Sequence, residues 1–286
     1  MSELRLDARK PLTKLREEWE ACIRCELGTR RMQRDGHFVF GQGYGHSIMF
    51  IGEGPGAEED ASGKPFVGRS GKLLRRILDV LGVTDYYITN IICCRSCEEM
   101  KDDKGMPVFG RGPKGVPVLR YKDEPPTPIH KNACRPRLLE EIYLVDPIVI
   151  VGLGGPACEA LLGHSITITR DRGETSQIAI PGASYRPVLT EKRQQWLRKN
   201  SEGEWHAPVE PNEVLYHFVP TLHPAYVLRE LADKGPNNAF QKLVSDIRSA
   251  VRTYEAYLET VFGALPVQRE VLDEAALHQE VEDTNE

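Results

Sequence analysis

The chain has 286 residues, which is enough for one large domain or two small ones. Hydrophobic residues make up 40% and charged residues 28%, a composition typical of a globular protein and not of a disordered one. No apolar stretch approaches the roughly 20 residues that span a bilayer, and the first residues lack a secretory signal pattern. We therefore expect a cytoplasmic protein with no membrane association.

The net charge of −5 is unevenly distributed along the chain. Residues 267–286 carry one basic and seven acidic side chains, so the rest of the chain is close to neutral. A near-neutral body does not exclude nucleic acid as a partner, because local patches matter more than totals. We interpret the acidic end as a disordered, solubilising tail.

The apolar pattern predicts an α/β fold. Four short apolar runs have the length of buried strands: 47–51, 87–91, 147–151 and 217–222. Helical spacing of apolar residues lies between and after them: 72–81, 138–145, 156–162 and, as a longer helix, 240–258. Strands that alternate with helices indicate a mostly parallel sheet with helices on both faces.

Two long segments interrupt this alternation, at about 95–130 and about 170–213. The first is rich in Gly and Pro, and it carries six basic and two acidic residues between Lys101 and Lys122. Both segments are too long for ordinary connections, which favours binding loops or mobile insertions. For the second segment we favour a solvated surface loop.

Polar side chains stand where the predicted strands end. Glu53 follows the first strand, Asn90 lies at the end of the second, and His223 follows the fourth. Ligands of parallel sheets bind beyond the carboxyl ends of the strands. A carboxylate, an amide and an imidazole at one edge of one sheet predict an active site there.

Seven cysteines are an odd number, and a disulfide framework is not expected in a cytoplasmic protein. Cys22-x-x-Cys25 has the spacing of a metal-ligand pair. By spacing alone, Cys94-x-x-Cys97 would complete a four-cysteine zinc site. The alternative set of Cys22, Cys25, Cys94 and Cys134 would suit an iron–sulfur cluster.

Several blocks of the sequence together resemble the iron–sulfur uracil-DNA glycosylases, the family-four branch of that superfamily. In chain order these blocks are Cys22-x-x-Cys25, Gly41-Gln42-Gly43, the run from Gly52 to Asp60, the run from Gly63 to Gly68, Thr89-Asn90, Cys94-Arg95, Cys134-Arg135-Pro136 and the run from His223 to Tyr226. The resemblance covers about residues 15–260, apart from the two insertions.

The resemblance implies a fold and a cofactor. The fold is a single-domain α/β/α sandwich with a four-stranded parallel sheet over residues 1–262, interrupted by the two insertions and followed by the acidic tail at 263–286. The cofactor is a structural [4Fe–4S] cluster, held by Cys22, Cys25, Cys94 and Cys134.

The resemblance also implies a reaction on DNA. The enzyme hydrolyses the bond between uracil and deoxyribose and leaves an abasic site, as a monofunctional glycosylase. Glu53 is implied to stabilise the positive charge on the sugar and to position the attacking water. His223 is implied to donate a hydrogen bond to O2 of the departing base. We expect DNA as the partner and a monomeric enzyme.

Further residues are implied to bind the flipped nucleotide. Phe66 stacks on the base, and the amide of Asn90 complements the O4 and N3–H edge of uracil. Glu59 crowds C5 and excludes the methyl group of thymine. Gly52 completes the substrate site, and the candidate DNA contacts are Tyr226 and Arg229.

Two alternatives stay open at this point. The same scaffold could excise a modified pyrimidine, or it could be a non-catalytic or covalently trapped nucleic-acid-binding iron–sulfur protein. Covalent trapping in a related branch uses a histidine in a basic loop. Residues 101–122 contain no histidine, although His130 lies just beyond them. We also hypothesise that the first insertion contacts phosphates or closes over a flipped base.

Overall fold

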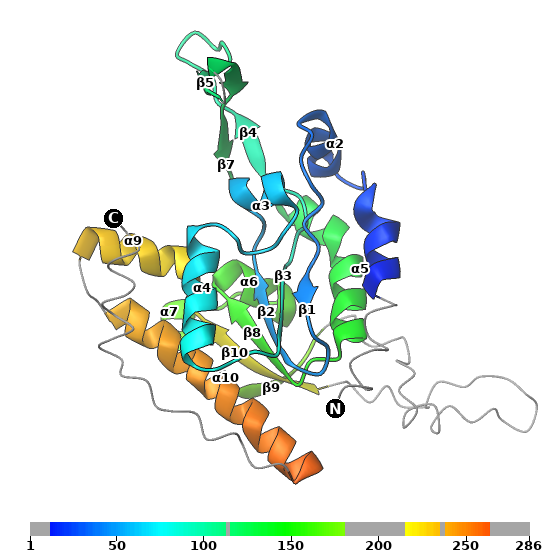
Figure 1. Cartoon of the computed structure of the whole chain (residues 1–286), viewed down its shortest axis with the longest axis vertical. Coiled ribbons are helices and arrows are strands. Elements are labelled where there is room, and N and C mark those ends of the chain that lie inside the picture. Colours follow the sequence, from blue (N-terminus) through cyan, green and yellow to red (C-terminus); the bar gives the residue numbers. More distant parts are fainter. Residues whose placement is uncertain (1–11, 113–114, 181–214, 235–237, 264–286) are drawn as a thin grey trace, which may run out of the picture.

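A six-stranded sheet forms the centre of the molecule (Figure 1). The computed structural model describes residues 12–112, 115–180, 215–234 and 238–263. Across the sheet the strands are β1 (Gln42–Gly43), β3 (Tyr86–Asn90), β2 (Ile48–Gly52), β8 (Val149–Leu153), β10 (Leu215–Thr221) and β9 (Ser176–Ala179). The four central strands are parallel, as predicted, and each lies within two residues of its predicted position. The antiparallel edge strands β1 and β9 were not predicted.

Helices occupy the connections between the strands. They comprise residues 12–20, α2 (Glu26–Gln33), α3 (Ala57–Ser62), α4 (Arg69–Val80), α5 (Pro128–Val145), α6 (Gly155–Leu162), α7 (Ile168–Asp171), α9 (Pro224–Lys234) and α10 (Asn238–Phe262). The expected helix at 138–145 is the second half of α5, which begins at Pro128 and continues through Pro136.

Two hydrophobic cores lie on opposite faces of the sheet. Side chains alternate along β2, so that Ile48 and Phe50 join one core while Met49 and Ile51 join the other. Helices α4, α9 and α10 cover the first face, and the helix of residues 12–20 with α2, α5 and α6 covers the second. The predicted α/β/α sandwich is thereby confirmed.

The first insertion is an ordered β-ribbon and not the loop that we expected. Strand β4 (Cys97–Glu99) pairs with β7 (Tyr121–Asp123), and β5 (Phe109–Arg111) pairs with β6 (Pro117–Leu119). Figure 1 shows this ribbon projecting beyond the sandwich, and we call residues 97–123 the arm. Its strands are exposed on both faces, so they lack the alternation of buried residues by which strands are predicted.

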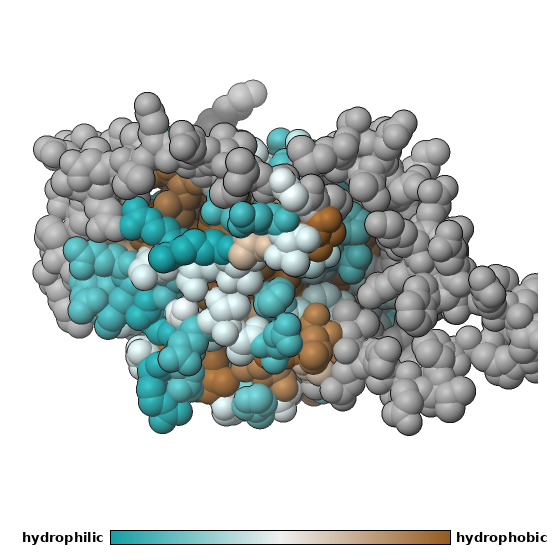
Figure 2. Space-filling model, turned by 90° about the horizontal axis from the view of Figure 1, so that it is seen from below, coloured by the Kyte–Doolittle hydropathy of each residue, from teal (hydrophilic) through white to brown (hydrophobic). Residues whose placement is uncertain are grey.

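Other expectations fall largely outside the described residues. Residues 181–214 of the second insertion and residues 264–286 of the acidic tail are among them, so the proposed domain division stays a prediction. No helix in the described ranges is both long and apolar enough to cross a bilayer. Figure 2 shows the end of the molecule opposite the arm, where hydrophobic and hydrophilic residues are interspersed.

A fully buried ion pair on α5 also forms hydrogen bonds to the end of β3. Arg137 pairs with Glu141, and both side chains are 0% exposed. The Tyr87 hydroxyl donates to Glu141 Oε1 at 2.8 Å. The guanidinium of Arg137 also donates to the backbone carbonyls of Asn90, at 2.8 Å, and Ile91, at 3.0 Å. These bonds fix the backbone at the point where β3 ends.

We predict that R137M lowers the free energy of unfolding by about 3–5 kcal/mol, because the Glu141 carboxylate loses its counter-charge in a dry site. Guanidinium-induced unfolding measures the difference. K14A is the matched control, since Lys14 and Glu18 form an ion pair of the same helical spacing on an exposed surface. It should cost less than about 1 kcal/mol. Equal losses in the two variants would contradict the importance of the buried pair.

Candidate active site

A cleft lies at the carboxyl edge of the parallel strands. It consists of two adjoining cavities of about 440 and 500 Å³, which share His223, Arg229 and Asp123 among their lining residues. The sequence analysis placed most of its site residues here, and those that line the cleft are Glu53, Glu59, Phe66, Asn90, His223, Tyr226 and Arg229. The strand exits thus converge as expected, and Asp123 adds a residue from the arm.

The amide of Asn90 is held in the cleft with one group unsatisfied. Asn90 is 2% exposed, and its Oδ1 has no hydrogen-bond partner among the described residues. Gly52 lies beside it, and a Cβ there would come within 2.6 Å of Asn90 Oδ1 and 2.5 Å of Phe66 Cζ. Only glycine leaves this space open. A buried acceptor without a partner costs about 1–3 kcal/mol, which a ligand N–H would offset.

Phe66 is held in an unusual backbone conformation. Its φ is +54°, which is uncommon for a bulky residue and is found where the surroundings enforce it. Arg75 of α4 donates to the Phe66 carbonyl at 3.1 Å and to the Pro65 carbonyl at 3.1 Å. A Cβ on Gly71 would collide with the Phe66 backbone. The ring is therefore positioned by α4 before any ligand arrives.

Glu59 binds the backbone of the same loop. Its Oε1 accepts from the N–H groups of Val67 and Gly68, both at 2.8 Å, and its Oε2 accepts from Gly56 at 3.0 Å. Glu59 is 7% exposed, so these charge-assisted bonds are shielded from water. The sequence analysis assigned Glu59 to the substrate. The geometry adds that its carboxylate fixes the loop that carries Phe66.

His223 is a neutral imidazole with a defined tautomer. The backbone N–H of Ala225 donates to Nδ1 at 3.1 Å, so Nδ1 carries the lone pair and Nε2 carries the proton. Burial, together with the charge of Arg229, lowers the pKa of His223 to about 4, and the charge of Glu59 opposes this shift. The imidazole ring centroid lies 6.3 Å from that of Phe66. His223 thus offers a neutral N–H donor beside an aromatic face.

Glu53 has a counter-ion that sequence analysis did not identify. Lys131 Nζ lies 3.6 Å from Glu53 Oε1, and both side chains are about a third exposed or less. Burial raises the pKa of Glu53, Lys131 opposes that rise, and Glu159 adds to it. The lysine therefore favours the carboxylate form of Glu53 within the cleft.

The four cysteines of the predicted cluster set act on one another. Cys94 and Cys134 are buried, whereas Cys22 and Cys25 are partly exposed, and all four are free thiols. Burial is the largest cause that raises the pKa of Cys94 to about 12, and the other three cysteines contribute to the rise. The same partially exposed pair also raises the pKa of Cys134. These four side chains are therefore near one another.

Buried cations accompany these thiols. Arg31 is 6% exposed, its charge lowers the pKa of Cys94, and its Nε has no hydrogen-bond partner in the described chain. Arg137 lowers the pKa of Cys134 in the same way. Four thiols beside a buried cation with a free N–H fit an anionic sulfur-ligated group, because such groups accept hydrogen bonds at sulfur.

A single-ion site is not formed. Among the described residues, no three His, Cys, Asp or Glu side chains are arranged to hold one metal ion. Each cysteine ligand of a four-iron cluster binds a different iron, so such ligands stand farther apart than those of one ion. Cys97 belongs to other surroundings at the base of the arm, where the charges that act on it are those of Arg34, Arg95, Asp60 and Asp123.

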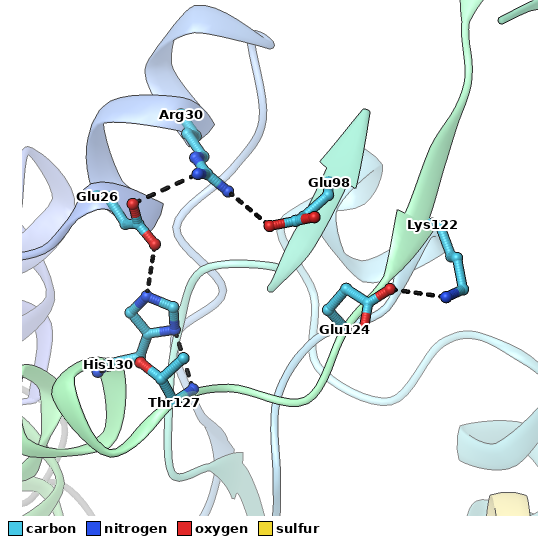
Figure 3. Close-up of polar contacts among 7 residues, drawn as sticks. All are labelled: Glu26, Arg30, Glu98, Lys122, Glu124, Thr127 and His130. Carbon is cyan, nitrogen blue, oxygen red and sulfur yellow. Dashed lines mark hydrogen bonds and ion pairs between the residues drawn. The ribbon is translucent and has the colours of Figure 1, made fainter. Parts of the chain in front are cut away.

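His130 is fully engaged in a polar network between the arm and α2 (Figure 3). Its Nδ1 accepts from the Thr127 backbone N–H at 3.1 Å, and its Nε2 donates to Glu26 Oε1 at 3.1 Å. The other oxygen of Glu26 accepts from Arg30, which also lies 4.0 Å from Glu98 of β4. With 5% exposure and both nitrogens bonded, His130 is not poised as a nucleophile.

Sequence reasoning missed four contributors to the site: Arg75, Asp123, Lys131 and Arg137. Charged residues in helices are normally assigned to the solvent, and the groups outside α5 that Lys131 and Arg137 contact lie far away in the chain. The basic residues near the Cys134 block are the only sequence signal that could have pointed to Lys131 and Arg137. Asp123 was hidden in the insertion.

The tautomer and burial of His223 lead to a pH prediction. The ordinary pKa of 6.5 applies to the unfolded chain and about 4 to the folded chain, so only the unfolded chain binds this proton between those values. Stability should therefore fall as the pH decreases from about 6.5 to 4, by up to about 1.4 kcal/mol per pH unit relative to H223Q. Chemical unfolding of both proteins at pH 4.5, 5.5 and 7 measures this difference. Parallel pH profiles would contradict the assignment.

Known proteins share this sequence pattern. The sequence profile of the Uracil DNA glycosylase superfamily matches residues 38–248. The type-4 uracil-DNA glycosylase of Thermotoga maritima is 29% identical over 222 residues, which are 76% of this chain and 83% of that protein. That of Archaeoglobus fulgidus is 29% identical over 198 residues, 65% of this chain and 85% of that protein. That of Sulfurisphaera tokodaii is 33% identical over 172 residues, 57% of this chain and 66% of that protein.

The profile match includes every strand of the parallel sheet and the whole lining of the cleft that was predicted from sequence. The chain therefore belongs to the uracil-DNA glycosylase superfamily.

Proposed function

We propose that this protein is a monofunctional uracil-DNA glycosylase that hydrolyses the N-glycosidic bond of uracil in DNA and leaves an abasic site. The observation that carries the proposal is the buried, unpartnered Oδ1 of Asn90 in a cavity that Phe66 and His223 also line. The relatives named as type-4 uracil-DNA glycosylases support the same reaction. We keep a monomer and a cytoplasmic location as expectations.

Asn90 selects the base by its two polar atoms. Uracil presents an N3–H donor for Oδ1 and an O4 acceptor for the amide N–H. Cytosine presents the reverse pattern, so its binding would leave groups unpaired at about 1–3 kcal/mol each. Phe66 offers a rigid aromatic face for stacking on the flipped base. Exclusion of the thymine C5 methyl by Glu59 stays a prediction.

His223 and Glu53 act on the charges that develop as the bond breaks. The departing base becomes negative at O2, and the neutral Nε2–H of His223 is a donor that needs no proton transfer to be ready. The sugar becomes positive, and the Glu53 carboxylate stabilises it and orients a water molecule for attack. Lys131 supports this role, because it favours the charged form of Glu53.

We further propose that Cys22, Cys25, Cys94 and Cys134 hold a [4Fe–4S] cluster. When bound, the cluster ties together the segment before α2, the exit of β3 and helix α5. Arg31 would donate to a cluster sulfur through its free Nε. The role is structural, since the cysteines are not among the residues that line the cleft.

We predict that H223A lowers the single-turnover rate of uracil excision about 10²–10³-fold, because it removes a preorganised donor to the leaving base. E53Q should lower it by at least as much, since the amide carries no charge. The rate is read by alkaline cleavage of a single-stranded oligonucleotide with one uracil. The exposed residues His164 and Glu18 supply the matched controls H164A and E18Q, which should excise at the wild-type rate. Near-wild-type excision by both site variants would refute the proposed mechanism.

A separate prediction concerns iron. Protein purified without oxygen should be brown and hold about four irons per chain. C94S and C134S should lose the colour and most of the iron, because each removes one ligand. C97S should keep both, since Cys97 lies among other charges at the base of the arm. A colourless protein with one zinc, or loss of metal in C97S alone, would favour the zinc alternative.

A covalently trapped binding protein is the less favoured candidate. That reading needs an available histidine in or beside the basic insertion, and His130, the candidate there, uses both ring nitrogens in hydrogen bonds. A non-catalytic binding module would have no use for the Glu53–Lys131 pair and the neutral His223 in one cleft. A modified pyrimidine would have to present the same donor and acceptor edge to Asn90.

A further inference from the structure

The arm is a hydrogen-bonded ribbon that divides into two hairpins. Backbone bonds join Met100 to Arg120, Arg120 to Val108 and Val108 to Met100, at 2.8–2.9 Å, so three chain segments meet beyond the inner pair β4–β7. Past this junction, Lys101 pairs with Pro107 in a short hairpin, and β5 pairs with β6 in a longer one that has Val108 and Arg120 at its base and that we call the outer hairpin. The arm projects from the sandwich (Figure 1), and its outer hairpin is a two-stranded element.

The base of the arm is fixed at the cleft. Arg95 Nε bonds to Asp123 Oδ1 at 2.6 Å, and the Arg34 guanidinium lies 5.4 Å from the centre of the Tyr121 ring. Asp123 lines both cavities of the cleft, and its neighbour Glu124 lines one. DNA that delivers a base into the cleft must therefore pass close to the arm.

The outer hairpin carries one sign of charge. Residues 108–120 contain three basic residues and no acidic one, whereas Asp102 and Asp103 lie in the shorter hairpin of the arm. Lys122 is neutralised by Glu124 at 2.8 Å. Arg111 and Arg120 are exposed, and neither forms an ion pair with an acidic side chain in the described part of the chain. Arg111 and Arg120 of the outer hairpin are thus available to a polyanion.

These two arginines lie on opposite faces of the ribbon. Phe109 pairs with Leu119 and Arg111 with Pro117, so alternation places Phe109 and Arg111 on one face. Val118 pairs with Gly110 and is followed two residues later by Arg120, which places both on the other face. The Arg120 guanidinium accordingly lies across Gly110.

Both faces also expose apolar side chains. Phe109 is 60% exposed on the first face, and Val118 is 50% exposed on the second. A flat partner could engage only one such face. A DNA groove has phosphates along both walls, and the major groove of B-form DNA admits a two-stranded β-ribbon.

On this basis we propose that the outer hairpin of the arm inserts into the major groove of duplex DNA beside the extruded nucleotide, with Arg111 and Arg120 on phosphates of opposite walls. The inference rests on the proposed function for the choice of DNA as the partner. It adds a proposed duplex-binding element beside the cleft.

The test compares R111A/R120A with the control R16A/R252A, which removes two exposed arginines that do not line the cleft. Excision is measured under single turnover over a range of enzyme concentrations, on a 30-base-pair duplex with one uracil and on the same strand alone. For R111A/R120A we expect the half-saturating concentration to rise about tenfold or more on the duplex. The slope of the logarithm of affinity against the logarithm of salt concentration should become shallower by about 2, because each lost phosphate contact removes about 0.9 from it. The rise on the single strand should be several-fold smaller.

An equal loss of affinity on duplex and single strand in R111A/R120A would overturn the groove assignment. No loss of affinity on either substrate would overturn the proposed DNA contact by the arm. The control should match wild type on both substrates, and equal unfolding midpoints of the two variants establish that folding is intact. Bulky C5 substituents on pyrimidines beside the uracil fill the major groove, and they should weaken wild type but not R111A/R120A. If a minor-groove ligand weakens binding of the wild type and the C5 substituents do not, the proposal is overturned.

Failure of the proposed function has a different signature. In that case wild type would excise uracil from neither substrate. Binding of the intact proteins to a uracil-free duplex, followed by fluorescence anisotropy, would still report whether R111A/R120A loses affinity and salt dependence.

Discussion

The buried Arg137–Glu141 pair is the interaction on which the site depends. Helix α5 carries this pair, Lys131 and Cys134, and the guanidinium bonds to the carbonyls where β3 ends. One helix thereby positions three groups: the Asn90 amide that we propose to read the base, the counter-ion of Glu53 and one proposed cluster ligand. A buried ion pair adds little net stability over an apolar replacement, but removal of one partner is costly. Its contribution here is to fix geometry, because the guanidinium of Arg137 bonds to the carbonyls of Asn90 and Ile91 and so holds α5 against the end of β3.

A second constraint acts on Phe66 from the other face of the sheet. A bulky residue with φ near +54° requires enforcement, and the bonds from Glu59 and Arg75 supply it. A carboxylate that accepts three backbone N–H bonds behaves as part of the scaffold. The aromatic platform and the Asn90 amide are thus both ordered before a base enters, so binding spends little free energy on rearranging the protein.

The sequence predicted the parallel strands and their exits because both follow from local rules. Buried parallel strands are short apolar runs, and residues that follow them must meet at one edge. The arm escaped prediction because its strands are exposed on both faces and rich in Gly and Pro. Arg137 and Lys131 escaped because helical periodicity assigns charged residues to solvent, while their partners come from β3 and the loop after β2. The shape of α5 was hidden by Pro136, which ordinarily interrupts a helix.

Burial acts on Glu53 and His223 in the same sense, since it favours the neutral form of each, yet the proposed mechanism needs a charged Glu53 and a neutral His223. Their neighbours separate them. Lys131 faces Glu53 and favours the carboxylate, whereas Arg229 acts on His223 and disfavours the imidazolium. Lys131 and Arg229 therefore favour a negative Glu53 and a neutral His223. In the proposed mechanism, these charge states suit a positive sugar and a negative leaving base. The backbone N–H of Ala225 donates to Nδ1, which leaves the remaining proton of His223 on Nε2. Helix α9, which carries both Ala225 and Arg229, therefore adds to the effect of burial on the charge of His223 and fixes the direction of its donor.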